Sequence, residues 1–220
     1  FEQIIPKFRG KAQSQRIIFF FADSYFQTKR YYLAAIQYQN FVKSYPKSDR
    51  IQEASFKEAK SYYYSSPSFS LDQEDTYTAI EKLQVFINLY PTSEYSVEAN
   101  QLISELQEKL EQKDFEISKQ YFTIRDYKAA IKSSDNFIAS FPGTKFREEA
   151  LYTKFNASYQ IAINSIFSLK KQRLSELQQQ FNIILRYYPE TVFLNDLEIK
   201  MIKVNSELEK IQPTISKLSK

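Results

Sequence analysis

The 220-residue chain contains no histidine and no cysteine, and it has only two glycines. Without histidine and cysteine it cannot form a Ser-His-Asp or Cys-His nucleophile, a Cys/His zinc site or a disulfide framework. So few glycines and prolines also disfavour a β-sandwich or barrel, which needs a turn about every 8–12 residues. We therefore expect a protein that is not an enzyme, with no catalytic residues and no cofactor or metal site.

Long apolar runs and strong charge clusters are also lacking. The longest apolar run, from Ile17 to Ala22, is far shorter than the roughly 20 residues that span a bilayer. The formal net charge is +4, and the whole excess lies in the second half of the chain. No run of five like charges occurs, which favours a solvated helix face over a nucleic-acid surface. Because the chain starts at Phe1 without a signal segment, we interpret it as a mature or truncated sequence.

Four of the seven prolines stand in one repeated motif, which is an aromatic residue, proline, any residue, and then serine or threonine. Proline cannot continue a helix, and it pushes the residue before it out of the helical region. Each motif therefore predicts the end of one helix, and its hydroxyl is expected to cap the next. The four copies are Tyr45-Pro46-Lys47-Ser48, Tyr90-Pro91-Thr92-Ser93, Phe141-Pro142-Gly143-Thr144 and Tyr188-Pro189-Glu190-Thr191.

Fixed offsets from these prolines predict the core. Five residues before each proline stands a large apolar residue, and eight residues after the first three stands an alanine, which allows a neighbouring helix to approach closely. The large residues are Phe41, Phe86, Phe137 and Ile184; the alanines are Ala54, Ala99 and Ala150, and the fourth copy has Leu197.

Helical periodicity between the prolines predicts about nine helices, paired as antiparallel hairpins. One hairpin cannot bury its apolar face alone, so we expect an all-α solenoid of TPR-like hairpins stacked into one array over residues 1–220. Its N-terminal units are expected in about 1–94 and its C-terminal units in about 95–220. HEAT-like packing has a closer period but lacks the proline motif between hairpins. The expected helices are residues 15–28, 33–44, 49–64, 76–89, 95–123, 126–140, 145–166, 170–187 and 192–211.

Aromatic residues also stand next to one another on the expected helices of the first half. Consecutive aromatics on a helix cannot all face one core. Either they wedge between stacked hairpins, or some of them line a groove for an extended peptide or a partner domain. Stacking on nucleic acid is disfavoured because no basic cluster accompanies them. The candidate groove residues are Tyr25, Phe26, Tyr62, Tyr63 and Tyr64.

Two stretches resemble the BamD family, the TPR lipoproteins of the outer-membrane β-barrel assembly machinery. The first is Tyr90-Pro91-Thr92-Ser93-Glu94-Tyr95, and the second is the turn Arg125-Asp126-Tyr127-Lys128-Ala129-Ala130 after the long helix expected at 95–123. The stretch Phe141-Pro142-Gly143-Thr144-Lys145-Phe146 is similar to the next repeat of that family. The loop at 65–73 resembles the version seen in Bacteroidetes-type members.

This resemblance implies five TPR units and a position on the periplasmic face of the outer membrane, held by a lipid anchor on a cysteine outside this chain. It also implies binding to the periplasmic domains of the barrel-forming subunit BamA, to other subunits of the machinery and to unfolded outer-membrane β-barrel proteins. We expect no binding to nucleic acid, because a basic cluster is missing. Partner docking is assigned by region, to the half with the positive excess. The candidate docking residues are Arg125, Asp126, Lys128, Lys132 and Arg147.

Two other classes of function stay open at this point. One is a different periplasmic TPR adaptor lipoprotein, for example in pilus or cell-wall assembly. The other is the helical domain of an enzyme whose catalytic part lies outside this chain. A lipidated cysteine before Phe1 in the full-length precursor would favour either lipoprotein over the enzyme domain.

Overall fold

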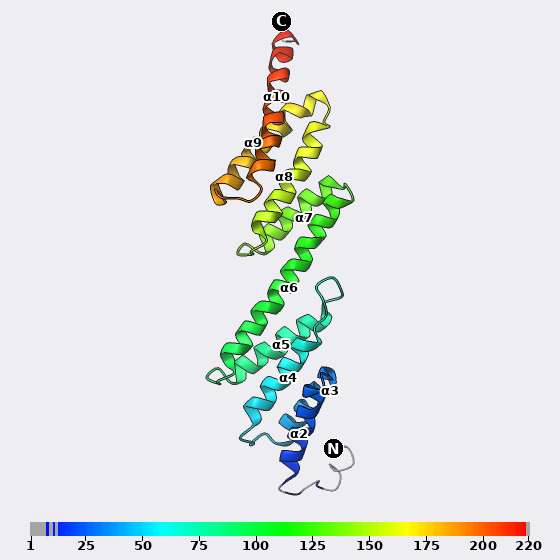
Figure 1. Ribbon diagram of the computed structural model, residues 1–220, viewed down its shortest axis with the longest axis vertical. Coiled ribbons are helices and arrows are strands. Elements are labelled where there is room, and N and C mark those ends of the chain that lie inside the picture. The colour runs from blue at the N-terminus through cyan, green and yellow to red at the C-terminus, as the bar shows by residue number, and fades with distance from the viewer. Residues whose placement is uncertain (1–7, 9–10, 12, 219–220) are drawn as a thin grey trace. The chain divides into compact units, whose positions relative to one another are not determined.

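The computed structural model describes residues 8, 11 and 13–218, and this part of the chain is helical (Figure 1). Among these residues there are nine α-helices and no strand, which confirms the expected all-α fold. The helices are α2 (Ser14–Gln27), α3 (Tyr31–Ser44), α4 (Ile51–Ser65), α5 (Glu74–Leu89), α6 (Ser96–Thr123), α7 (Tyr127–Ser140), α8 (Arg147–Ile163), α9 (Phe167–Tyr187) and α10 (Leu194–Leu218).

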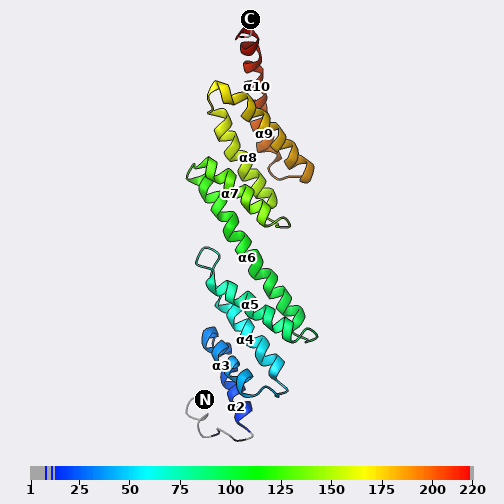
Figure 2. The same ribbon diagram turned by 180° about the vertical axis from the view of Figure 1, so that it is seen from behind.

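Contacts between residues divide the chain into two compact units, Phe1–Leu110 and Glu111–Lys220. In the first unit α2 packs on α3, α3 on α4 and α4 on α5; in the second α7 packs on α8, α8 on α9 and α9 on α10. Consecutive helices of each unit run in opposite directions (Figure 1 and Figure 2), so the expected antiparallel hairpins are present. The boundary between the units falls within α6. The single array over residues 1–220 stays a prediction.

The four proline motifs form connectors with the same backbone hydrogen bonds. In each connector the N–H of the aromatic residue before proline donates to the carbonyl oxygen four residues earlier, at 2.8–2.9 Å. The N–H of the serine or threonine then donates to the carbonyl oxygen of that aromatic residue, at 3.0–3.2 Å. The helices before the connectors therefore end where the sequence predicted, at Ser44, Leu89, Ser140 and Tyr187.

The hydroxyl groups of the connectors do not cap the next helix in the expected way. Each accepts the N–H two residues further on, as Thr144 does from Phe146 at 3.2 Å and Ser48 does from Arg50 at 3.1 Å. The next helix begins one residue after the residue that donates this N–H. The hydroxyl therefore stands three residues before the helix and does not bond to the free N–H groups of its first turn. The motif is a serine or threonine turn that leads into the helix.

The core positions predicted from the proline offsets are confirmed. Phe41, Phe86, Phe137 and Ile184 are at most 3% exposed, and Ala54, Ala99, Ala150 and Leu197 are fully buried. The alanines lie at the start of α4, α6 and α8, where each packs within an apolar cluster.

A contact that the sequence analysis did not predict recurs at each connector. In each connector, the residue four positions after the proline has a planar side-chain group. This group packs on an aromatic ring of the helix that lies two helices earlier in the same unit. Such stacked pairs contribute about 0.5–1.5 kcal/mol beyond area burial, and here they join successive hairpins. The Arg50 guanidinium lies 4.7 Å from the Phe19 ring centroid, and the ring pairs are Tyr95–Phe56 at 5.0 Å, Phe146–Phe115 at 5.4 Å and Phe193–Tyr152 at 3.9 Å.

The turns between α2 and α3 and between α6 and α7 share a left-handed residue. Lys29 has a φ of 59° and Arg125 a φ of 64°. In each turn the next N–H donates to a carbonyl five residues earlier, at 2.9 Å from Arg30 and 3.0 Å from Asp126. This pattern is a Schellman cap, which usually has glycine at the left-handed position.

We expect the substitution Arg125→Gly to raise the free energy of unfolding by about 0.5–1 kcal/mol. A side chain in the left-handed region costs about 1–3 kcal/mol, and the extra freedom of glycine in the unfolded chain offsets part of the gain. Urea denaturation followed by circular dichroism measures the change. Thr123→Gly, which places glycine in the last turn of α6, should instead lower the free energy of unfolding. A lower value for Arg125→Gly would contradict the assigned strain.

Two expected helix ends are wrong, and one is the end of α8, which lies at Ile163 rather than at residue 166. The last helix was expected to stop at Ile211 because Pro213 follows, but α10 continues to Leu218. Proline removes one helical hydrogen bond and crowds the preceding turn. A long helix such as α10 can continue past a proline near its end, because only one of its many backbone hydrogen bonds is lost there.

Candidate protein-interaction sites

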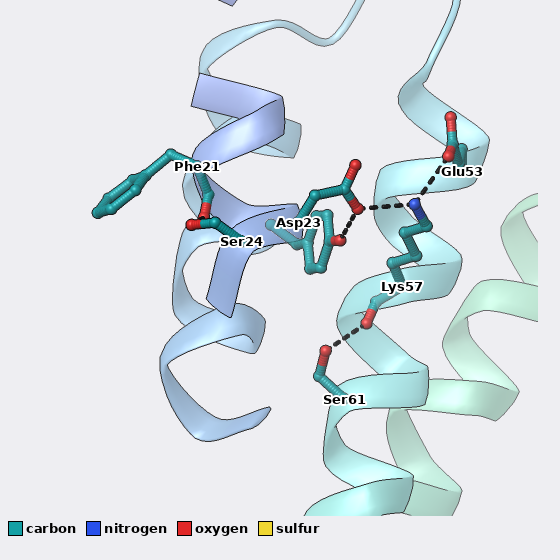
Figure 3. Close-up of polar contacts among 7 residues, drawn as sticks. Phe21, Asp23, Ser24, Glu53, Lys57 and Ser61 are labelled. Carbon is teal, nitrogen blue, oxygen red and sulfur yellow. Dashed lines mark hydrogen bonds and ion pairs between the residues drawn. The ribbon is translucent and has the colours of Figure 1, made fainter. Parts of the chain in front are cut away.

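A polar cluster fixes three helices of the first unit relative to one another. The Lys57 ammonium on α4 lies 2.7 Å from a carboxylate oxygen of Asp23 on α2 and 2.9 Å from one of Glu53 (Figure 3). The same Asp23 oxygen accepts the hydroxyl of Tyr38 on α3. Because breaking such a partly buried pair leaves an uncompensated charge, the cluster locks the packing of α2, α3 and α4.

The hydrogen bonds of this cluster favour the charged form of Lys57. Burial alone would lower the pKa of Lys57, but its hydrogen bonds to Asp23 and Glu53 outweigh that effect and raise it. The stability that this interaction contributes is therefore fully present below the ordinary lysine pKa and is lost as the pH rises through the raised value. Burial, and then the hydrogen bond to Asp23, raise the pKa of Tyr38 well above its ordinary range.

Beside these helices lies a hollow of about 470 Å³, which we call the aromatic hollow. The turn before α3 and the first residues of α3 form one side, the end of α4 forms another, and Asp75 of α5 completes it. Its rim carries two cations that form no ion pair within the described part of the chain. The lining residues are Lys29, Arg30, Tyr31, Tyr32, Leu33, Tyr62, Ser65 and Asp75.

The predicted groove residues divide into three groups. Tyr62 lines the aromatic hollow directly. Phe26 and Tyr64 support it, because the Tyr64 ring stacks on Tyr31 at 4.8 Å and Phe26 contacts the Tyr31 ring at 5.5 Å. Tyr64 remains 44% exposed.

The other two predicted groove residues lie elsewhere. Tyr25 packs on Phe21 of its own helix at 4.8 Å between ring centroids. Tyr63 donates its hydroxyl to Glu105 of α6, and this hydrogen bond, followed by burial, raises the pKa of Tyr63 to about 12. Some of the predicted aromatics therefore pack between helices and others lie at a hollow, and binding of a peptide or partner there stays a prediction.

The sequence analysis missed most of the wall of this hollow. Tyr32 is 66% exposed and lines the hollow together with Tyr62, but it was not among the candidate residues. A signal was present, because the stretch from Tyr25 to Ala34 corresponds to the stretch from Tyr121 to Ala130. That correspondence gives both segments the same turn and the same place in the fold.

The loop between α4 and α5 is held by its own side chains. Gln73 is buried, and its amide donates to the carbonyl oxygens of Ser68 at 2.8 Å and Leu71 at 2.9 Å. Lys109 of α6 donates to the Ser66 hydroxyl at 2.8 Å, and burial lowers the pKa of Lys109. These bonds fix the start of α5, which carries Asp75 to the hollow.

In the second unit, the predicted docking residues lie at different places on the hairpin of α7 and α8. Lys128 and Lys132 are exposed one turn apart on α7. Asp126 caps α7 by accepting the N–H of Ala129 at 3.1 Å, and Arg125 occupies the left-handed turn position. These four residues gather at the start of α7.

Arg147 does not join that group. It stands at the connector beyond the other end of α7, where its guanidinium lies 5.9 Å from the Tyr187 ring centroid and donates to the Pro142 carbonyl oxygen at 3.4 Å. Its guanidinium already contacts Pro142 and Tyr187 at the end of α9, so it is a weaker candidate for docking than Lys128.

None of the helices in the described part of the chain combines the length and the apolar character that crossing a bilayer requires. Within the same residues, no three His, Cys, Asp or Glu side chains are grouped closely enough to hold a metal ion. The surface features that remain are the aromatic hollow, the start of α7 and the hollows of the second unit.

Comparison with known proteins identifies the family to which the chain is similar. The family model described as YfiO, outer membrane lipoprotein, matches residues 1–174 and 126–218. No curated protein matches significantly. A solved structure of the yeast histone chaperone Hif1, described as a scaffold protein recruiting protein complexes to core histones, aligns with 12% identity over 90% of this chain and 95% of that chain. Its TM-score is 0.31, which is too low to carry an argument.

The fold and these surfaces define an all-α helical-repeat protein. The chain belongs to the YfiO family, the BamD-type outer membrane lipoproteins. Membership implies a place at the periplasmic face of the outer membrane and a role in outer-membrane assembly with protein partners. The resemblance to Bacteroidetes-type members stays a prediction.

Proposed function

We propose that this protein is a scaffold of the outer-membrane β-barrel assembly machinery, with a different partner on each unit. The first unit binds extended segments of unfolded barrel proteins in the aromatic hollow, and the second binds the periplasmic domains of BamA. A lipid anchor outside this chain would hold it at the membrane. The observation that carries the proposal is the aromatic hollow with its unpaired cations, in a chain of this family.

The chemistry of the hollow suits a strand of a membrane barrel. Such a strand alternates apolar side chains that face lipid with polar ones, and aromatic girdles flank its apolar band. Tyr31, Tyr32 and Tyr62 offer rigid rings, which are the side chains that most often anchor interfaces. The volume of about 470 Å³ is within the usual range for a binding pocket. Lys29 and Arg30 can form charge-assisted hydrogen bonds with a carboxylate of the bound segment.

The start of α7 suits a folded partner with an acidic surface. Lys128 and Lys132 are exposed on one side of the helix, and the positive excess of the chain lies in this half. Complementary charge raises the rate of encounter and fixes the register of docking more than it raises affinity. BamA, which the family resemblance implies, is the partner we assign to this surface.

The double substitution Tyr62→Ala and Tyr64→Ala should weaken binding of a peptide from the C-terminal strand of a barrel protein by roughly tenfold or more. Removing one aromatic anchor commonly costs more than about 1 kcal/mol of binding free energy. Photocrosslinking of the labelled peptide to the purified chain measures the loss. Binding of the BamA periplasmic region should be unchanged.

The control is Tyr77→Ala, because Tyr77 is 62% exposed on α5 and does not line the hollow. It should leave peptide crosslinking unchanged. Lys128→Glu with Lys132→Glu should have the opposite effect to the tyrosine pair, weakening BamA binding and sparing the peptide. If both sets of substitutions abolished the same interaction, or neither affected any, the assignment of two partners to two units would be wrong.

A further inference from the structure

The second unit has a hollow of about 190 Å³ between α7, α8 and α9, which we call the charged hollow. Its apolar lining is Ile131 and Ile161, and its polar wall consists of Lys128, Ser158, Arg173, Glu176 and Gln180. Binding pockets for small molecules usually measure about 300–1,000 Å³. The charged hollow is therefore the right size for one inserted side chain rather than for a cofactor.

The charged hollow occupies the same place in the repeat as the aromatic hollow. Lys128 corresponds to Tyr32 at the start of the first helix, and Ser158 corresponds to Tyr62 on the second. Each pair lies 96 residues apart, as do Pro46 and Pro142. The fold has thus placed a hollow at one position twice, and the side chains have changed its chemistry from aromatic to charged.

The cations of the charged hollow are available to a ligand. Neither Lys128 nor Arg173 forms an ion pair among the residues that the structure describes. Arg173 donates one N–H to the Ser165 hydroxyl at 2.6 Å, which orients its guanidinium and leaves four of its five N–H donors. The Glu176 carboxylate accepts the side-chain amide of Gln172 at 2.8 Å and keeps its charge, so the lining has two cations against one carboxylate.

A buried acceptor in the same wall lacks a donor. The Gln180 amide nitrogen donates to the Ser158 hydroxyl at 3.2 Å, while its oxygen, Oε1, is buried with no hydrogen-bond partner. An unpaired buried acceptor is destabilising, and an N–H group of a ligand would supply the missing hydrogen bond. The polar wall can therefore bind an anion through Lys128 and Arg173. It can also accept a hydrogen bond through Gln180 Oε1 from a donor next to that anion.

We infer that the charged hollow receives an aspartate or glutamate side chain of the partner that docks on the second unit. The carboxylate would lie between Lys128 and Arg173, and a backbone N–H of the same partner segment would donate to Gln180 Oε1. This inference rests on the proposed function, in which that partner is BamA. It adds Arg173 and Gln180 to the docking surface and makes Lys128 part of a built site.

The test measures the affinity of the purified chain for the purified BamA periplasmic region by isothermal titration calorimetry. Arg173→Gln and Lys128→Gln should each weaken binding by roughly tenfold, as expected for the loss of a charge-assisted hydrogen bond. The double variant should lose less than the product of the two, because both cations hold one carboxylate. Lys171→Gln, which removes an exposed charge of α9 outside the hollow, is the matched control and should change the affinity less than twofold.

A charge exchange then identifies the inserted residue. Arg173→Glu should be rescued by one particular Asp→Lys or Glu→Lys substitution in the BamA region and by no other. Lys128 is exposed, so its variant should keep the fold and remain informative even if Arg173 variants lose stability. If the unaltered chain binds BamA but both hollow variants behave like Lys171→Gln, the inference is wrong and the proposed function stands. If the unaltered chain does not bind BamA, the proposed partner and this inference are both wrong.

Discussion

Replacing Phe115 by alanine is expected to lower the free energy of unfolding of the second unit by about 3–5 kcal/mol, the usual cost of removing a large buried aromatic side chain. Phe115 of α6 is 1% exposed and stacks on Phe146 at 5.4 Å between ring centroids. It also contacts Phe137 at 5.7 Å, and these residues with Ala150 form a small core cluster. Few neighbours are available to fill the cavity that the substitution leaves.

Urea denaturation of the full chain, followed by hydrogen exchange of α7 and α8 amides, measures this loss. Exchange is needed because repeat proteins can unfold in parts, so one spectroscopic midpoint need not describe both units. Ile117→Ala, on the same helix but partly exposed, should cost at most about 1 kcal/mol. A loss for Phe115→Ala no larger than that of Ile117→Ala would show that the cluster does not hold the second unit together.

Ala150→Leu is expected to lower the free energy of unfolding by about 1–3 kcal/mol through overpacking. Ala150 is fully buried one turn into α8, and it packs with Phe115 and Phe137. Three added carbon atoms have no space there unless α8 moves away from its neighbours. Ala99→Leu should have a similar effect in the first unit, because Ala99 is equally buried at the same offset from its proline.

Thermal denaturation of the two variants, compared with Ala139→Leu, measures the effect. Ala139 is exposed on α7, so the same change of side chain there should leave the melting temperature nearly unaltered. Melting temperatures unchanged within error for Ala99→Leu and Ala150→Leu would show that the repeated alanine is not required for close packing.

The repeat could be predicted from the sequence because its causes are local. Proline stops a helix wherever it stands, and an offset of five or eight residues from it fixes the same place on a helix face each time. Phe86 and Ala99 were therefore correctly assigned to the core. The connector hydroxyl was expected to accept an N–H of the first helical turn, but it accepts the N–H two residues further on. Two turn residues separate the hydroxyl from the next helix, and the motif does not specify them.

Which side chains line each hollow could not be predicted in the same way. Tyr62, Tyr63 and Tyr64 are consecutive, so neighbouring residues point about 100° apart around α4. Which of them meets a hollow depends on where α3, α5 and α6 pack. Tyr63 donates a hydrogen bond to Glu105 of α6, whereas Tyr62 lines the hollow with Tyr32 of α3.

The sequence by itself determined the all-α fold, the hairpin period, the core positions and the family. Only the tertiary structure decided that Lys128 lies with Arg173 and Gln180 in one hollow, since these residues come from two helices separated along the chain by a third. Only the tertiary structure also decided that Arg147 packs on Tyr187 at the end of α9. The physical reason is that proline and apolar spacing act along one helix, whereas a binding site is made where several helices meet.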